Sequence, residues 1–254
     1  MAIEVGGHID DRLWQGFWDV VLVFASVLLA VLFGVAAGNV ARGAPLDARG
    51  EFAMAFFTDF GVRGQVGLLD WYTLSVAAFG VVVLAAHGAT YLALRTEGPV
   101  HDRSTRYAAC LWMAAAPLLV VVSVESWIVR PELAPRVVAN PLCWIGALAV
   151  AAAMVTLASG ISKHRELRAF VGSNALLVAL LATGGAAMFP VMLHSTLAPE
   201  HALTAYAVAA GPDSLRLASL WWPAGLVLAS AYFVFISRRY AGKVSIQRDN
   251  QGYY

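Results

Sequence analysis

The chain has 254 residues, of which 60% are hydrophobic and only 13% are charged, and its formal net charge at pH 7 is +1. Soluble domains are on average about half apolar and about a quarter charged, so this composition is typical of a membrane protein instead. A net charge this small provides no basic surface for nucleic acid, and no nucleic-acid partner is expected.

Six segments of the chain are apolar runs without Asp, Glu, Lys or Arg, as a bilayer-spanning helix of about 20 residues requires. In chain order they are residues 20–40, 71–94, 108–124, 142–158, 170–193 and 220–236. The short alternating segments of a membrane β-barrel are absent from the sequence. The sequence therefore predicts an all-α fold, in which residues 1–254 form a single membrane domain, a polytopic helical bundle with about six transmembrane helices.

The residues before the first run include Glu4, Asp10 and Asp19. A cleavable secretion signal has a basic start, so we expect the first run to remain as a membrane span. The connections on the side of the two termini carry eleven Lys and Arg residues, and those on the other side carry six. The positive-inside rule then predicts that both termini are cytoplasmic.

Few residues inside the spans could hold a cofactor. A haem in a membrane bundle needs two axial ligands on facing helices, and His87 is the one histidine within a predicted span. Cys110 and Cys143 each begin a predicted span, but on opposite sides of the membrane, which excludes a disulfide between them. Two isolated thiols also cannot form a cysteine-rich metal site. We expect no metal and no haem bound by this chain alone.

The remaining polar residues of the spans have a structural interpretation. His87 and Asn39 are expected to be buried polar contacts between helices, because small neighbouring residues let membrane helices approach and hydrogen-bond. Asp70 and Glu125 lie at predicted span ends, where a carboxylate is usually solvated at the membrane edge, and proton handling is the alternative role for either residue. From the residues alone, the chain is interpreted as a six-span packing subunit.

Three stretches carry a resemblance to a known family. Residues 14–47 begin WQGFW and end GNVARGAPLD, residues 87–98 read HGATYLALRTEG, and residues 184–190 read GGAAMFP followed by Ser195 and Thr196. In this order they resemble subunit II of cytochrome bd-type quinol oxidases, from about residue 4 to the C-terminus. One departure is that the family pattern begins with about three further helices, and this sequence starts at a position after them, as a fragment, a split gene product or a shortened variant would.

The resemblance implies a subunit of a bacterial terminal oxidase that oxidises quinol and reduces dioxygen to water in the respiratory chain. It implies that haems b and d belong to the partner, subunit I, and that this haem-free chain stabilises the complex within the inner membrane and its lipid. A structural quinone is a further expected ligand. Glu4 matches an acidic family position, which makes it the candidate for a proton path; no residue is expected to be catalytic.

Two other classes of protein remain as alternatives. A small secondary transporter would bind solute by itself, with a polar cavity around Ser173 or Asn174. An independent membrane haem b protein would show a haem spectrum in the isolated chain, and that spectrum would depend on His87.

Overall fold

The computed structural model describes residues 6–7, 9, 11–52, 54–58, 60–61 and 65–244. Among these residues, six helices are long and apolar enough to cross a membrane. They are α2 (Arg12–Arg42), α3 (Trp71–Arg95), α4 (Pro99–Val129), α6 (Pro141–Ser162), α7 (Glu166–Met188) and α8 (Pro212–Arg239). The predicted all-α membrane bundle with about six transmembrane helices is confirmed.

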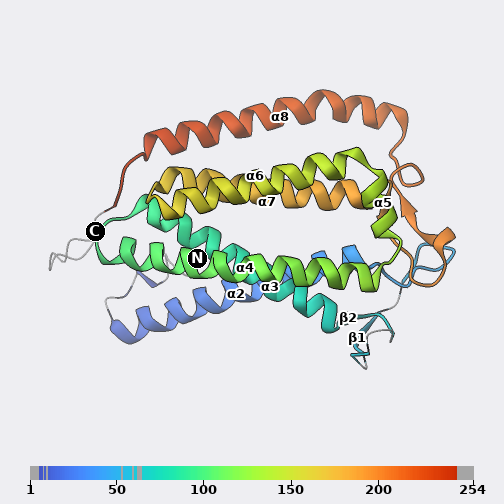
Figure 1. Cartoon of the computed structure of the whole chain (residues 1–254), viewed down its shortest axis with the longest axis horizontal. Helices are drawn as coiled ribbons and strands as arrows, with labels where there is room; N and C mark the ends of the chain where they lie inside the picture. Colours follow the sequence, from blue (N-terminus) through green and yellow to red (C-terminus); the bar gives the residue numbers. More distant parts are fainter. Residues whose placement is uncertain are drawn as a thin grey trace.

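Short elements complete the described chain. Helix α5 (Leu133–Ala139) lies between α4 and α6, and the 3-10 turn η1 (Pro199–His201) precedes α8. Strands β1 (Ala55–Phe57) and β2 (Gly67–Leu69) pair in parallel, and β3 (Val191–Leu193) pairs antiparallel with β4 (Leu203–Thr204). These strands lie in the connections at one end of the bundle, on the right in Figure 1.

The helices extend beyond the apolar runs, except at the end of α7. The predicted span 170–193 stops at Met188, and Val191–Leu193 forms β3 instead. Pro190 has no N–H for the helical ladder and disfavours helical geometry at the residue before it. Phe189 accordingly has the extended ψ of 139°. Proline therefore ends this helix although the apolar run continues.

Four helices, α3, α4, α6 and α7, enclose the buried core. They contribute the cluster Val83, Ala86, Ala108, Trp112, Ala115, Ala153, Leu157, Ala169 and Leu176. Most of these side chains are small, so the helices are held by close van der Waals approach, which is how membrane helices associate when lipid is as apolar as the core. At Gly172 of α7, an added Cβ would lie 2.5 Å from the Leu157 backbone nitrogen of α6, so only glycine fits there.

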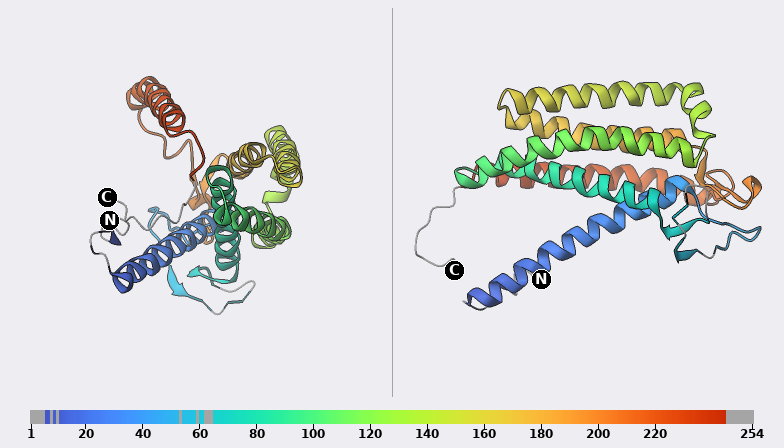
Figure 2. Two further views of the ribbon diagram at one scale, coloured as in Figure 1. Left: turned by 90° about the vertical axis from the view of Figure 1, so that its left-hand side faces the viewer. Right: turned by 60° about the horizontal axis from the view of Figure 1, so that its bottom comes forward.

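Two helices lie at the periphery. Helix α2 contacts the core helices only through its second half, where its buried residues are Gly34, Val35, Gly38 and Arg42. Its first half diverges from the bundle, and α8 stands apart from the other helices (Figure 2). None of the described residues of α8 is buried. Large apolar surfaces of both helices therefore face outward.

At both ends of the bundle, hydrogen bonds and an ion pair hold the connecting segments together. At the strand end, the Ala44 N–H donates to the His194 carbonyl (2.9 Å) and the Ser195 hydroxyl donates to the Leu46 carbonyl (2.9 Å). At the opposite end, the segment after α8 returns to the α3–α4 turn, where Val244 N–H donates to Arg95 O (2.8 Å) and Lys243 Nζ lies 2.8 Å from Glu166 Oε2. The start of α2 and the end of α8 lie at this second end (Figure 1).

Candidate functional site

A group of charged and polar side chains lies at the strand end of the bundle, where α2 and α4 end and α3 begins. Arg42 in the last turn of α2 forms an ion pair with Asp70, and these side chains are 5% and 1% exposed. Asp70 also caps α3, because its Oδ1 accepts from Thr73 N–H (2.9 Å) while Thr73 Oγ1 accepts from Asp70 N–H (3.0 Å). The expectation that Asp70 is solvated at the membrane edge is therefore wrong.

Arg130, the residue that follows α4, extends this group. Its side chain is 2% exposed, its Nε donates to Glu132 Oε1 (2.9 Å), and its Nη1 donates to the Ala41 carbonyl (3.0 Å). The second bond satisfies a carbonyl in the last turn of α2, which has no partner within its own helix. Arg130 thereby joins the end of α4 to the end of α2.

His194, in the connection after β3, lies on the outer side of this group, with Nε2 3.6 Å from Glu132 Oε1. Partial burial raises the pKa of Glu132, but the hydrogen bond from Arg130 and its positive charge outweigh burial, so the pKa lies below its ordinary value. Partial burial and the positive charge of Arg130 lower the pKa of His194. Both shifts favour an ionised Glu132 beside a neutral His194 at neutral pH.

Two further pairs lie deeper in the helices. Glu125 of α4 accepts a hydrogen bond from Ser75 of α3 (Oγ to Oε1, 3.2 Å). The Tyr72 hydroxyl lies 2.9 Å from Ser126 Oγ. Since the Ser126 hydroxyl donates to the Val122 carbonyl (2.7 Å), it accepts from Tyr72.

We call these residues the strand-end polar cluster: Arg42, Asp70, Tyr72, Glu125, Ser126, Arg130, Glu132 and His194.

His87 lies near the middle of the bundle, apart from this cluster. Its Nδ1 is 2.9 Å from Ser173 Oγ, and its ring stacks on Phe170 of α7 with centroids 5.5 Å apart. The Ser173 hydroxyl donates to the Phe170 carbonyl (2.8 Å), so its oxygen accepts from His87, which assigns the ring proton to Nδ1. His87 is half-buried and links α3 to α7.

Asn39 and Glu4 are the other two residues singled out by the sequence. Asn39 is half-buried, and its Nδ2 donates to the Val35 carbonyl within α2 (2.9 Å) and to the Leu68 carbonyl of β2 (3.0 Å). It thus ties α2 to the strand that precedes α3. Glu4 lies outside the described residues. The geometry does not bring His87 and Asn39 together, since each has separate partners.

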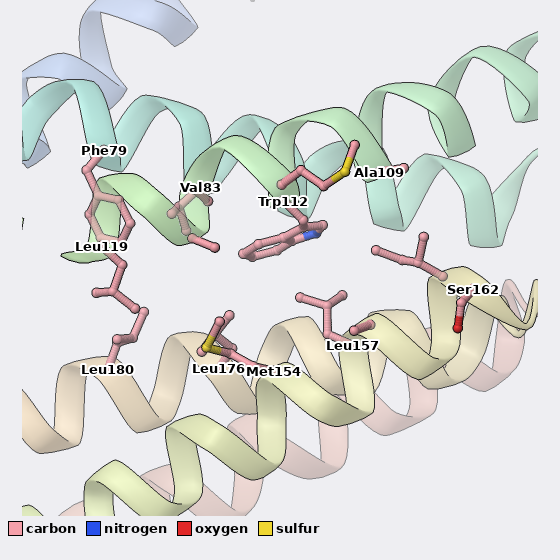
Figure 3. A pocket seen from close by; sticks show the side chains of 15 residues that line it. Phe79, Val83, Ala109, Trp112, Leu119, Met154, Leu157, Ser162, Leu176 and Leu180 are labelled. Atoms are coloured by element: carbon pink, nitrogen blue, oxygen red, sulfur yellow. The ribbon is translucent and has the colours of Figure 1, made fainter. Parts of the chain in front are cut away.

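An apolar pocket of about 360 Å³ lies between α3, α4, α6 and α7. Its walls include Phe79, Trp112, Met113, Met154 and Leu180, with Ser162 at one end (Figure 3). The Trp112 indole N–H is already engaged with Thr90 Oγ1 (3.0 Å). Such a pocket suits an apolar chain, because almost nothing in its wall is free to bind a polar head group.

The described residues contain no group of three His, Cys, Asp or Glu side chains placed to hold a metal ion. Among them, the histidines other than His87 lie in the first turn of α4 (His101) or in connections (His164, His194, His201). The described chain can therefore pair buried charges and bind apolar ligands, but its side chains do not form a metal centre.

Sequence reasoning missed most of the polar cluster, although one signal was present. Asp70 directly before an apolar run, with Thr73 three residues later, is the pattern of a helix cap. Pro131 after Arg130 is consistent with the end of α4 there. No local pattern brings Arg42, Arg130 and His194 together, because they come from three distant segments of the chain.

Comparison with known proteins identifies relatives along the chain. The family model for cytochrome bd terminal oxidase subunit II matches residues 1–239. Cytochrome bd-I ubiquinol oxidase subunit 2 of Escherichia coli K12 is 26% identical over an alignment of 233 residues, and the match covers 80% of this chain and 59% of the relative. The probable cytochrome oxidase subunit 2 of Haemophilus influenzae is 24% identical over 270 residues, covering 96% of this chain and 70% of the relative.

A shorter match is the cytochrome bd ubiquinol oxidase subunit 2 of Bacillus subtilis, 26% identical over 109 residues, or 42% of this chain and 29% of the relative. The chain spans 59% of the length of its Escherichia coli relative. Six spanning helices and these relatives together indicate a multi-pass bacterial membrane protein.

Proposed function

Because this chain belongs to the cytochrome bd terminal oxidase subunit II family, we propose that it is the second subunit of a bd-type oxidase. In this proposal the complex takes electrons from quinol and reduces dioxygen to water in the respiratory chain. The match of the family model to residues 1–239 carries the proposal. The chain contributes no catalytic residue and stabilises a haem-bearing subunit I.

The haem-free role is supported by the chemistry of the spans. A bis-ligated haem b needs a second His or Met facing the first ligand. The described mid-span residues include no second histidine. His87 therefore has no histidine partner among these residues, and on this ground we assign haems b and d to subunit I.

The stabilising role is supported by the outward faces of α2 and α8. No residue of α8 is buried within this chain, and its exposed surface combines aromatic side chains with small residues such as Gly225 and Ala229. Small residues one turn apart let a second helix approach closely. We assign part of this surface to subunit I and the rest to lipid.

A structural quinone is the ligand proposed for the apolar pocket between α3, α4, α6 and α7. The pocket of about 360 Å³ accommodates part of an isoprenoid tail, and Ser162 is its polar end. A lipid acyl chain has the same chemistry. Organic extraction of the purified chain followed by mass spectrometry distinguishes quinone from lipid.

The remaining expectations belong to the same proposal. Glu4 is the proton-path carboxylate, and His87 and Asn39 are structural contacts. The start of α2 and the end of α8, which lie at the same end of the bundle, face the cytoplasm because Lys and Arg are more numerous at that end.

Deleting the gene for this chain tests the function. We expect membranes of the deletion strain to lose the d-type haem band and bd-dependent quinol oxidation, and both to return when the chain is supplied from a plasmid. Unchanged bands and oxygen uptake in the deletion strain would contradict the proposal.

A further inference from the structure

The strand-end polar cluster has one carboxyl group more than its cations can pair. Arg42 is paired with Asp70, and Arg130 with Glu132. Guanidinium groups are always charged in proteins, so these two pairs are neutral as units. Glu125 is the fifth charged residue of this group, and its described partner is the neutral hydroxyl of Ser75.

The second oxygen of Glu125 is buried. Oε2 has less than 1 Å² of exposed surface and no hydrogen-bond partner among the described residues. An unpaired carboxylate in apolar surroundings is strongly disfavoured, whereas a protonated carboxyl needs only one acceptor for its hydrogen. These surroundings favour the protonated form of Glu125, and in that form the Oε2 hydroxyl requires an acceptor.

A buried donor faces the same part of the cluster. Arg130 Nη2 is buried without a hydrogen-bond partner among the described residues, although the Nε and Nη1 of this side chain are both bonded. The Tyr72 hydroxyl bonds to Ser126, the residue after Glu125, and Tyr72 lies one helical turn before Ser75, the partner of Glu125. Internal water is held where two or more buried polar groups lack protein partners.

We propose that Glu125 is a proton-exchanging carboxyl, connected to solvent at the strand end by internal water held by Tyr72 and Arg130. Glu132 and His194 form the mouth of this path, since Arg130 bonds to Glu132 and His194 lies beside it on the outer side. In the transfer, the carboxyl O–H bond breaks and the proton passes through water to bulk solvent. The carboxylate that remains keeps its hydrogen bond from Ser75, and the reverse transfer restores the acid.

Infrared spectroscopy of the whole chain in lipid nanodiscs tests this inference, because a protonated carboxyl has its own C=O stretching band. At neutral pH we expect a band that is present in the natural chain, absent in Glu125→Gln and displaced in Glu125→Asp. On transfer to heavy water, the band should shift as the proton exchanges, and Tyr72→Phe should slow that shift several-fold. The matched control is Tyr91→Phe, which removes an outward-facing hydroxyl from the same helix and should leave the rate unchanged.

Two results would overturn the inference. The absence of any Glu125-dependent carboxyl band at neutral pH would show that Glu125 is ionised. A band whose exchange is equally fast in the natural chain, Tyr72→Phe and Tyr91→Phe would show that water at Tyr72 does not carry the proton. Should Glu125→Gln fail to fold, the displaced band of Glu125→Asp provides the same assignment.

Discussion

Burial, more than sequence position, decides which charged residues of this chain affect its stability. Arg42 and Asp70 are almost fully enclosed, whereas the ion pair between Arg49 and Asp47 lies in the same connection with side chains that are 78% and 40% exposed. Exposed pairs contribute little, because solvent screens them and their side chains lose entropy on pairing. Removing one partner of an enclosed pair instead leaves an uncompensated buried charge.

The substitution Asp70→Asn leaves the buried charge of Arg42 without its partner and so measures the effect of that charge on stability. Asparagine keeps the size of the side chain and the oxygen that caps Thr73, so the loss of the charge beside Arg42 is the main change. We expect the extracted protein to lose about 3–5 kcal/mol of stability, measured by thermal unfolding. Asp47→Asn is the matched control, with an expected effect below about 1 kcal/mol. Equal unfolding temperatures for the two variants would contradict the importance of burial.

His194 and Glu132 make stability depend on pH in one direction. The pKa of each is lowered in the folded protein, so the unfolded chain binds more protons and stability falls as pH falls. The loss of stability begins below about pH 6.5, where the imidazole of His194 becomes protonated in the unfolded chain. It continues near about pH 4.3, where the carboxylate of Glu132 becomes protonated in the unfolded chain.

Thermal unfolding between neutral and mildly acidic pH measures this effect. His194→Gln should remove the first part of the pH dependence, and His164→Gln, at an exposed position in the α6–α7 connection, should keep it. A pH profile that is the same for the natural chain and His194→Gln would show that His194 does not contribute.

At the scale of elements, apolar runs and proline positions predicted most of the fold. The six runs became six helices because a span without charges has no alternative to helix in lipid. The end of α7 was misplaced because hydropathy continues through Pro190, where the backbone can no longer be helical. Most of the strand-end polar cluster was not predictable, since the bond from Arg130 to Ala41 and the pair of His194 with Glu132 join segments that are distant in the sequence.

The contact between α6 and α7 depends on glycine at one position. In Gly172→Ala, the new methyl group would lie 2.5 Å from the Leu157 nitrogen, so the helices must separate. We expect a loss of about 1–3 kcal/mol, as overpacking costs elsewhere, visible as a lower unfolding temperature. Gly184→Ala is the control on the same helix, because nothing lies within 4 Å of its added carbon. A loss as large in Gly184→Ala would show that helix propensity or another general effect is responsible.

At the scale of the whole molecule, the chain has a packed core and two helices whose surfaces are largely exposed. Four helices bury a common core, while α2 is buried only in its second half and α8 not at all. An apolar helix facing lipid is stable in a membrane, but an outward face with small residues also suits a neighbouring helix. This asymmetry accords with a subunit that contacts a larger partner, as proposed from its family.

The central claim is that this chain works as subunit II beside a haem-bearing partner, and one measurement tests it most directly. The tagged chain is extracted in mild detergent, its co-purifying proteins are identified, and a reduced-minus-oxidised spectrum is recorded. We predict a second membrane protein and bands of b- and d-type haem in the same fraction. A colourless chain that purifies alone, or a haem spectrum from the chain without a partner, would contradict the account.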